Sequence, residues 1–166
     1  MKDYVYPTTS LKQSALDEGQ VVTVLRKPEL RYAWDAGVAI GHYLEELKQG
    51  RLVARLCHRC RRIMIPPRMF CERCFRPTDE WVTVQDTGTV KTFSLCYVTW
   101  DMTRLEHPQM PAVIDIDGAS RGMGIMHLLG EVDPQTVQIG MRVQAVWKPA
   151  EERVGAITDI AYWKPI

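Results

Sequence analysis

The chain of 166 residues contains no long hydrophobic run. No apolar stretch approaches the roughly 20 residues that a helix needs to cross a bilayer. The first residues, Met1–Pro7, lack the apolar core of a signal peptide. We therefore expect a cytoplasmic protein in a reducing compartment, where cysteines stay reduced and remain available as metal ligands.

The sequence also lacks the common signatures of catalysis. It contains no Ser/His/Asp order, no phosphate-binding loop and no glycine-rich dinucleotide motif. The four histidines are scattered along the chain: His42, His58, His107 and His127. Cys96 alternates with apolar neighbours, so we interpret it as a small side chain packed on one face of a strand. The chain is not expected to be an enzyme by itself.

The other four cysteines form two Cys-x-x-Cys pairs. They are Cys57, Cys60, Cys71 and Cys74. Two residues between cysteines let both sulfurs of a tight turn point at one centre, and the segment between the pairs brings the second turn opposite the first. The spacing predicts a tetrahedral metal site in a zinc ribbon. Four cysteine ligands leave no open coordination position, so we expect the ion to be structural.

Zinc is the expected ion and iron is the alternative, because tetrahedral thiolate ligands suit either metal. The spacing of the cysteines does not distinguish between them. An iron site would bring a redox role that a zinc site lacks, and the purified protein would then be reddish. Two disulfides would need an oxidising compartment, which nothing else in the sequence supports.

Positive charge gathers around the cysteines, although the net charge is only +1. Residues 51–76 include eight arginines and a single acidic residue, Glu72. Guanidinium groups bind phosphate and carboxylate well, so the cluster predicts an anion site with Arg61, Arg62 and Arg68 as candidate ligands. The alternative is that these side chains pair with acidic residues of the same chain or of a partner. The sequence leaves both interpretations open.

The segment before the cysteines is expected to contain an arm and one helix. Residues 1–30 carry little pattern and indicate an arm that packs on something else. Asp35 is a suitable N-cap for a helix, and Gly50 is a suitable C-terminal stop. Between them, apolar side chains recur with the spacing of one helix face, at Ile40, Tyr43, Leu44 and Leu47.

After the cysteines the chain indicates one strand after another. A long first strand is expected over residues 81–100, bent at Gly88. Four more strands are expected over Pro111–Asp117, Met123–Val132, Met141–Lys148 and Val154–Lys164. Five strands in about 85 residues predict a small closed barrel, and the OB-fold is the commonest architecture of this size and order.

These patterns predict an α+β fold, mainly β, in three parts. An N-terminal arm and helix occupy residues 1–50, a zinc ribbon occupies 51–80, and an OB-fold barrel occupies 81–166. The ribbon segment is too short to build a core of its own, so the metal must stabilise it.

Taken together, the motifs resemble a known family of zinc-ribbon and OB-fold proteins, domain of unknown function 35, which is found beside thiolases and related acyl-CoA condensing enzymes. The resemblance runs from about Tyr32 to the C-terminus. Besides the cysteines it rests on Trp34–Gly37, Tyr43–Leu52, Ile65–Arg68, Trp81–Val84, Gly88–Val90 and Ile139–Val143. The combination is specific, whereas none of the stretches outside the cysteines is specific alone.

The resemblance implies a helical N-terminal segment, a rubredoxin-like zinc ribbon and a C-terminal OB barrel. It also implies a non-catalytic scaffold that binds a thiolase-like or HMG-CoA-synthase-like enzyme and helps to hold or pass acyl-CoA. Two places depart from the family pattern. Arg61 stands where the family commonly has a glycine with positive φ. The loop Asp115–Met123 replaces an acidic stretch, which would change specificity if the loop contacts the ligand or partner.

Two functions are compatible with these residues. For an acyl-CoA-associated scaffold, the arginines complement the phosphates of CoA. The loop Tyr97–Pro108 contains both the aromatic ring of Trp100 and the cation of Arg104, a combination that suits contact with a ligand or partner. The alternative is an ordinary loop with a packed Trp100. The second function is a nucleic-acid-binding OB-fold protein for single strands. The excess of acidic over basic residues outside the ribbon opposes this second function.

Overall fold

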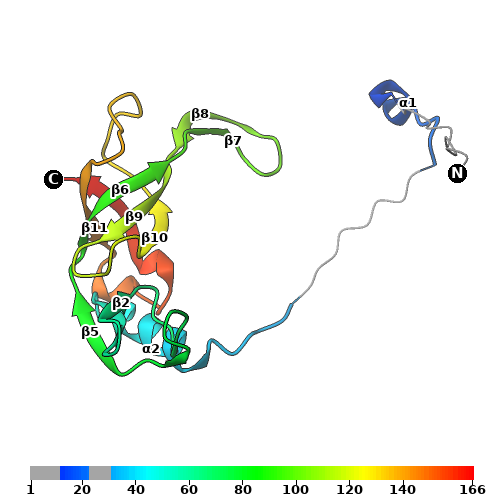
Figure 1. Ribbon diagram of the computed structural model, residues 1–166. Helices are drawn as coiled ribbons and strands as arrows, with labels where there is room; N and C mark the ends of the chain where they lie inside the picture. The colour runs from blue at the N-terminus through cyan, green and yellow to red at the C-terminus, as the bar shows by residue number, and fades with distance from the viewer. Residues whose placement is uncertain (1–11, 23–30) are drawn as a thin grey trace, which may run out of the picture. The chain divides into compact units, whose positions relative to one another are not determined.

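Figure 1 shows the computed structural model, which describes residues 12–22 and 31–166. Residues 1–11 and 23–30, which carry much of the predicted N-terminal arm, lie outside the described part. Helices and strands keep the labels of Figure 1 below. None of the helices in the described part of the chain is long and apolar enough to cross a membrane.

Contacts divide the chain into two units, one ending at Trp34 and one beginning at Asp35. The first unit contains a single short helix among its described residues, α1 (Gln13–Asp17). The aromatic rings of Tyr32 and Trp34 pack edge to face in the same unit, with centroids 5.8 Å apart. All other helices and strands that the structure describes belong to the second unit, which holds the cysteines.

The predicted helix before the cysteines is confirmed as α2 (Gly37–Lys48). Asp35 accepts a hydrogen bond from the backbone N–H of Gly37 at 2.9 Å, so its carboxylate satisfies a free donor of the first turn, although Ala36 occupies the cap position itself. Tyr43 and Leu47 are buried, as the apolar stripe predicts. After the helix the chain turns at Gly50, whose φ of +72° lies in the left-handed region that glycine adopts easily.

The zinc ribbon consists of five short strands. They are β1 (Leu52–Cys57), β2 (Arg62–Met64), β3 (Phe70–Cys71), β4 (Arg76–Pro77) and β5 (Glu80–Val84). An antiparallel sheet runs in the order β2-β1-β5, and β3 pairs with β4 in a separate hairpin. One cysteine turn follows β1 and the other follows β3, so each turn is held by its own pair of strands.

Strand β5 corrects the prediction of one long first strand in the barrel. The sequence continues that strand from Trp81 through Gly88, but β5 pairs with β1, with Arg55 opposite Trp81. The chain leaves this sheet after Val84 and enters the next sheet as β6 (Thr87–Phe93). Alternation of side chains identifies a strand but not its partner, because pairing depends on segments that are distant in the sequence.

The second sheet has five antiparallel strands in the order β10-β9-β6-β11-β12. The strands not yet defined are β9 (Pro111–Ile116), β10 (Gly124–Leu128), β11 (Arg142–Trp147) and β12 (Ile160–Pro165). Its edge strands β10 and β12 are not neighbours in the described sheet, and one isolated bridge joins Leu129, just after β10, to Trp163 of β12. The predicted closed barrel is therefore wrong in this detail, because the edge strands of a twisted sheet diverge.

Gly88 permits a close approach of strands rather than a bend. A Cβ atom at Gly88 would lie 2.5 Å from the carbonyl oxygen of Asp115 on the neighbouring strand β9. Real Cβ atoms do not come so close to backbone oxygen atoms. The glycine therefore lets β6 and β9 pack side by side where any other side chain would separate them.

A separate hairpin connects β6 to β9. It contains β7 (Cys96–Val98) and β8 (Arg104–Gln109), which pair with each other and with no other strand in the described ranges. Figure 1 shows the hairpin extending away from the five-stranded sheet. The strand predicted to continue to Trp100 is thus interrupted at Ser94–Leu95. Of the loop predicted over Tyr97–Pro108, residues 99–103 form the tip of this hairpin, and the remainder lies in β7 and β8.

The segment before β12 forms a loop and not the predicted strand. Its two 3-10 turns are η1 (Ala150–Glu152) and η2 (Ile157–Asp159). The fully buried carboxylate of Asp159 accepts hydrogen bonds from three successive backbone N–H groups, those of Val154, Gly155 and Ala156, at 3.0, 2.7 and 3.1 Å. A buried carboxylate needs such partners. Asp159 therefore fixes the path of the loop.

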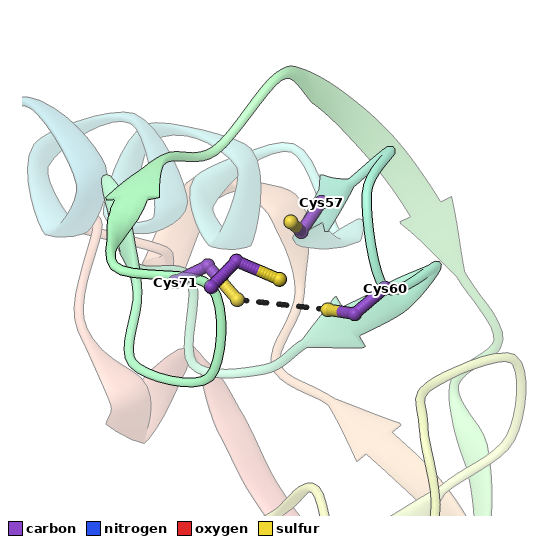
Figure 2. A group of neighbouring side chains, drawn as sticks. Cys57, Cys60 and Cys71 are labelled. Carbon is purple, nitrogen blue, oxygen red and sulfur yellow. Dashed lines mark hydrogen bonds between the residues drawn. The ribbon is translucent and has the colours of Figure 1, made fainter.

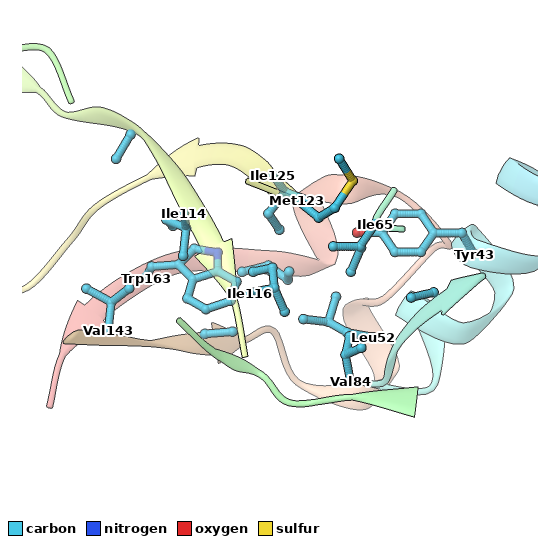
Figure 3. Close-up of a cluster of buried hydrophobic side chains, with 14 of the residues drawn as sticks. Tyr43, Leu52, Ile65, Val84, Ile114, Ile116, Met123, Ile125, Val143 and Trp163 are labelled. Carbon is cyan, nitrogen blue, oxygen red and sulfur yellow. The ribbon is translucent and has the colours of Figure 1, made fainter. Parts of the chain in front are cut away.

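One hydrophobic core joins the ribbon to the OB-fold sheet. Figure 3 shows Tyr43, Leu52 and Ile65 at one end of this core and Val143 with Trp163 at the other. Trp163 is completely buried. Because the buried side chains form one continuous cluster, the ribbon and the barrel are expected to stabilise each other.

Candidate metal centre and surrounding surfaces

The four paired cysteines come together as the sequence predicts. Their sulfur atoms all lie within 4.8 Å of one another. The sulfurs of Cys60 and Cys71 are 3.6 Å apart, and Figure 2 shows these two atoms and the Cys57 sulfur directed toward a common centre. A tetrahedral ion with Zn–S bonds of about 2.3 Å would hold its sulfurs about 3.8 Å apart. The donor set and its spacing therefore fit a zinc ion bound by Cys57, Cys60, Cys71 and Cys74.

The surroundings favour a thiolate at one of these cysteines. Backbone hydrogen bonds from Cys60, and further bonds from neighbouring thiols and Arg59, lower the pKa of Cys57 to about 6. Burial raises the pKa of Cys74 to about 12, and the adjacent sulfurs add to this shift. A thiolate at Cys57 gives a divalent cation its first ligand, and binding then displaces protons from the other thiols.

A charged network, which the sequence did not reveal, braces the first cysteine turn. Arg76 donates two hydrogen bonds to the carboxylate of Asp79, at 2.9 and 2.8 Å. Asp79 also accepts a hydrogen bond from the backbone N–H of His58 at 2.6 Å. The His58 N–H and the Arg76 guanidinium lower the pKa of Asp79. Partners of this kind orient the ligands of a metal site.

Each cysteine turn ends in a residue with left-handed backbone. Arg61 follows the first turn with φ of +57°, and Phe75 follows the second with φ of +51°. Arg61 stands where a glycine would relieve this conformation. Arg61 adopts the positive φ itself, so the turn keeps its shape at the expense of local strain.

Replacement of Arg61 by glycine is expected to stabilise the metal-loaded protein by about 1 kcal/mol, because glycine adopts a positive φ without strain. The measurement is the shift in the urea unfolding midpoint. Arg59→Gly is a matched control in the same turn, since Arg59 has no positive φ. This control is expected to destabilise the protein. An equal loss of stability in both variants would contradict the prediction.

Five of the eight arginines form hydrogen bonds or ion pairs with other residues of the chain. Arg55 is buried, where it donates hydrogen bonds to the hydroxyl and the carbonyl of Thr78 at 2.9 and 2.7 Å. Its guanidinium also lies over the ring of Trp81, 4.8 Å from the centroid. The ion pairs of the others are Arg51–Glu46, Arg62–Glu72, Arg68–Glu72 and Arg76–Asp79. Acidic residues of the same chain therefore neutralise much of the positive cluster.

The three other arginines are exposed and form no ion pair with any described residue: Arg59, Arg61 and Arg73. Of the three candidate anion ligands, Arg62 and Arg68 share Glu72. Arg61 alone remains exposed without such a partner. Ion pairs within the chain thus occupy two of the three candidate anion ligands.

The other two candidate residues, Trp100 and Arg104, lie at the tip of the β7–β8 hairpin. Trp100 is 96% exposed and Met102 is 81% exposed, so the interpretation of a packed Trp100 is wrong. The tip is ordered by Thr99, which exchanges hydrogen bonds with the backbone of Thr103 at 2.9 and 3.1 Å. Figure 1 places the hairpin and ribbon strands β2 and β5 at opposite ends of the second unit. The hairpin residues therefore do not join the ribbon arginines in one site.

A cavity that the sequence did not indicate opens between the edge strands β10 and β12. Its volume is about 420 Å³, and its walls are mainly apolar. A second cavity of about 210 Å³ shares Pro111 and Met126 with it. The sequence feature that could have indicated this cavity lies in β10. There Ile125 is buried, while the apolar side chains of Met126 and Leu128 are exposed. Outward apolar residues on a half-buried strand mark a surface that contacts something.

Two family models match the chain. The model described as the rubredoxin-like zinc ribbon domain of ChsH2 matches residues 44–80, and the model of its C-terminal OB-fold domain matches residues 81–148. They confirm the predicted zinc ribbon and OB-fold. They also support zinc as the ion that the clustered cysteines are placed to hold.

Two curated relatives resemble the chain in sequence. A "DUF35 domain-containing scaffold protein" from Methanocaldococcus jannaschii is 30% identical over 118 residues, which cover 69% of this chain and 82% of the relative. A "Probable enoyl-CoA hydratase alpha subunit" from Thermomonospora curvata is 30% identical over 111 residues, or 66% of this chain. The match covers 33% of this second relative, so the chain corresponds to about a third of its length.

Two solved structures share the fold. A DUF35-family protein of unknown function from Sulfolobus solfataricus matches with a TM-score of 0.57 and 24% identity, over 66% of this chain and 78% of that one. A structure described as "Ltp2-ChsH2(DUF35) aldolase" matches with a TM-score of 0.57 and 23% identity, over 81% of this chain and 98% of that one. The four-cysteine ribbon, the OB-fold sheet and the extensive match to the Methanocaldococcus jannaschii relative together show that the chain belongs to the DUF35 family.

Proposed function

We propose that this chain is a non-catalytic accessory subunit of an acyl-CoA-processing enzyme complex. It binds a thiolase-like or HMG-CoA-synthase-like enzyme and helps to bridge subunits or to pass acyl-CoA between them. The observation that carries the proposal is the ordered hairpin tip at which Trp100 is 96% exposed. Large aromatic side chains provide much of the binding energy of protein interfaces, and tryptophan is enriched at their centres.

The relatives support an assembly of this kind. One is described as a scaffold protein, one as a subunit of an enoyl-CoA hydratase, and one as part of an aldolase complex with Ltp2. Two of these three descriptions name an enzyme in which a DUF35 chain or its relative is one component. We carry over to this chain the role of a subunit that accompanies an acyl-CoA enzyme.

The described side chains favour an accessory role over independent catalysis. A four-cysteine ion has no open position at which to activate water or substrate. The ring of His42 packs against the ring of Trp81 at 4.3 Å. His127 contacts the carbonyl oxygen of Ile157 at 3.2 Å. These contacts give both histidines structural tasks.

The composition of the hairpin fits the surface of a protein partner. Trp100 and Met102 form an exposed apolar tip, Tyr97 adds a half-exposed aromatic ring, and Arg104 places a cation beside them. Aromatic residues, methionine and arginine are enriched in interfaces relative to other surface. Trp100 and Arg104 therefore remain our candidates for the partner contact. Arg61 is the remaining candidate for an anionic group such as a CoA phosphate.

The alternative of binding single-stranded nucleic acid receives less support. OB-folds bind nucleic acid across their second and third strands, with bases stacked on aromatic rings in a basic groove. The corresponding strands here are β9 and β10, and the exposed side chains of Met126 and Leu128 make β10 an apolar surface. An apolar surface offers little attraction to phosphates.

Substitution of Trp100 by alanine is expected to weaken capture of the partner enzyme at least tenfold, because a buried interface tryptophan commonly contributes 2 kcal/mol or more. The measurement is recovery of a thiolase-like or HMG-CoA-synthase-like protein with tagged chain from its own source, followed by titration of the purified pair. Trp34→Ala is the matched control, because Trp34 is also highly exposed. Repeated recovery of the wild-type chain as a lone monomer would contradict the proposal.

A further inference from the structure

The second cysteine turn, Cys71–Cys74, is flanked by exposed apolar side chains. Phe75 is 81% exposed, and Phe70 is 48% exposed. Their rings pack edge to face, with centroids 6.3 Å apart. Neither ring belongs to the hydrophobic core of the described residues. Met69, which precedes Phe70, is 42% exposed and adds apolar area. Exposed apolar side chains that gather in one place indicate a surface that contacts another molecule.

Phe75 is held in a backbone conformation that a glycine would adopt at lower cost. Its φ of +51° lies in the left-handed region, which bulky side chains rarely occupy. Its N–H donates a hydrogen bond to the carbonyl oxygen of Cys71 at 2.9 Å, so the turn fixes the residue in place. A glycine here would remove both the strain and the exposed ring. Because the phenylalanine costs stability in both ways, we infer that its ring serves a contact outside the fold.

The tip of the β7–β8 hairpin shows the same combination of strain and exposure. Met102 has a φ of +65° and is also 81% exposed. Backbone strain concentrates at functional sites, where a contact offsets its cost. Figure 1 places the hairpin and the ribbon strands β2 and β5 at opposite ends of the second unit. The ribbon turn and the hairpin tip are therefore suited to two separate contacts.

Positive charge accompanies the apolar side chains of the ribbon turn. Arg73 lies within the turn, is exposed, and forms no ion pair with any residue that the structure describes. Its neighbour Glu72 is shared by Arg62 and Arg68, so three arginines stand against one carboxylate. An excess of guanidinium groups complements carboxylates on a partner. We name four side chains the second-turn surface: Met69, Phe70, Arg73 and Phe75.

We propose that the second-turn surface docks an acidic surface of the partner protein. This inference rests on the proposed function and adds to it a second place of contact and the charge of the partner there. A second copy of the chain is a poor occupant, because pairing through this surface would bring arginines of like charge together. Single-stranded nucleic acid stacks its bases on the faces of aromatic rings along a basic groove. Phe70 and Phe75 instead place the edge of one ring against the face of the other.

The test is titration of the metal-loaded chain and its variants with the purified enzyme that the wild-type chain recovers from its own source. Phe75→Gly is expected to raise the urea unfolding midpoint, because glycine relieves the positive φ. The same variant should weaken binding of the enzyme at least tenfold, because it removes an interface aromatic ring. Phe75→Tyr keeps an aromatic ring and should bind as the wild type does. A lower midpoint or an unchanged affinity in Phe75→Gly would overturn the inference.

A charge reversal tests the acidic character of the partner. Arg73→Glu should weaken binding of the enzyme at least tenfold and reduce its dependence on salt, because screening acts on the attraction between opposite charges. Lys48→Glu is the matched control, since it makes the same change in net charge at an exposed residue of α2. This control should leave binding unchanged. Equal effects of the two substitutions would overturn the inference.

The outcomes separate this inference from the proposed function. Capture of the enzyme that needs Trp100 but is indifferent to Phe75 would overturn the inference alone. Capture that needs Phe75 but not Trp100 would overturn the role of the hairpin and leave the inference standing. A wild-type chain that recovers no enzyme would overturn both. A dimer of the chain that Phe75→Gly dissociates would overturn the inference in favour of a second copy. Binding of single-stranded oligothymidylate that this variant loses would overturn it in favour of nucleic acid.

Discussion

Removal of the metal is expected to unfold the zinc ribbon and to lower the Tm of the whole second unit. A structural zinc ion contributes about 10–16 kcal/mol to the folding of small modules, which equals or exceeds the total stability of many domains, about 5–15 kcal/mol. The short ribbon strands have little core of their own. Because Tyr43, Leu52 and Ile65 share one cluster with the barrel, loss of the ribbon also exposes part of the barrel core.

The matched variants are Cys57→Ser and Cys96→Ser. Cys57 is completely buried at the metal centre, whereas Cys96 is partly exposed and lies outside it. Cys57→Ser should lose bound metal and shift calorimetric unfolding by tens of degrees, and Cys96→Ser should retain both. Elemental analysis of the wild type identifies zinc or iron at the same time. Loss of metal with an unchanged Tm in Cys57→Ser would contradict a structural ion.

Asp159→Ala is expected to destabilise the second unit by about 3–5 kcal/mol. The carboxylate is fully buried and accepts three backbone hydrogen bonds. Removing it leaves buried N–H groups without acceptors, and hydrogen bonds to charged groups contribute about 1.5–3 kcal/mol each. Urea unfolding measures the loss. Asp133→Ala is the control, because Asp133 accepts one side-chain hydrogen bond in an exposed turn, from the Gln135 N–H.

The lowered pKa of Asp159 predicts that the folded protein loses stability in acid. Burial by itself raises the pKa of Asp159, but the three backbone N–H groups and the charge of Lys148 outweigh burial, so the net pKa is lowered. A lowered folded pKa contributes stability that is present above the unfolded pKa of about 3.9 and is lost as the pH falls through the folded value. The stability difference between wild type and Asp159→Asn should therefore narrow below about pH 4. A difference that stays constant down to pH 2 would contradict this origin.

The metal centre could be predicted from the sequence because its geometry is local. Two residues between cysteines determine how each pair of sulfurs converges, whatever the rest of the chain does. The positive φ at Arg61 was indicated by the family resemblance, because the family commonly has a glycine at this position, and Arg61 adopts it. The helix before the cysteines could also be predicted from the sequence, because the spacing of Tyr43 and Leu47 follows helical geometry.

The roles of the arginines could not be predicted in the same way. Arg62 and Arg68 look like anion ligands in the sequence, but both contact Glu72 in the fold. Arg55 looks like one more surface cation, yet it is buried against the ring of Trp81 and hydrogen-bonded to Thr78. Whether a charged side chain is free depends on which groups the fold places beside it.

For the strands, too, the sequence predicted one property and left another undetermined. Alternation identified most β segments but predicted one continuous strand from residue 81, whereas β5 pairs with β1 and a separate strand, β6, enters the next sheet. It also missed the loop that Asp159 organises, because apolar residues in that loop mimic a strand. Side-chain alternation reports which face is buried, while strand partners and buried capping groups are long-range properties.

The sequence by itself determined a four-cysteine zinc ribbon, a helix before it and an OB-fold sheet after it. It did so because ligand spacing and side-chain periodicity act over a few residues. Only the tertiary structure decided that the positive cluster is largely neutralised, that Trp100 is exposed on a hairpin, and that a mainly apolar cavity opens between β10 and β12. The cavity lies between edge strands that begin 36 residues apart, and no local pattern specifies which distant strands border it.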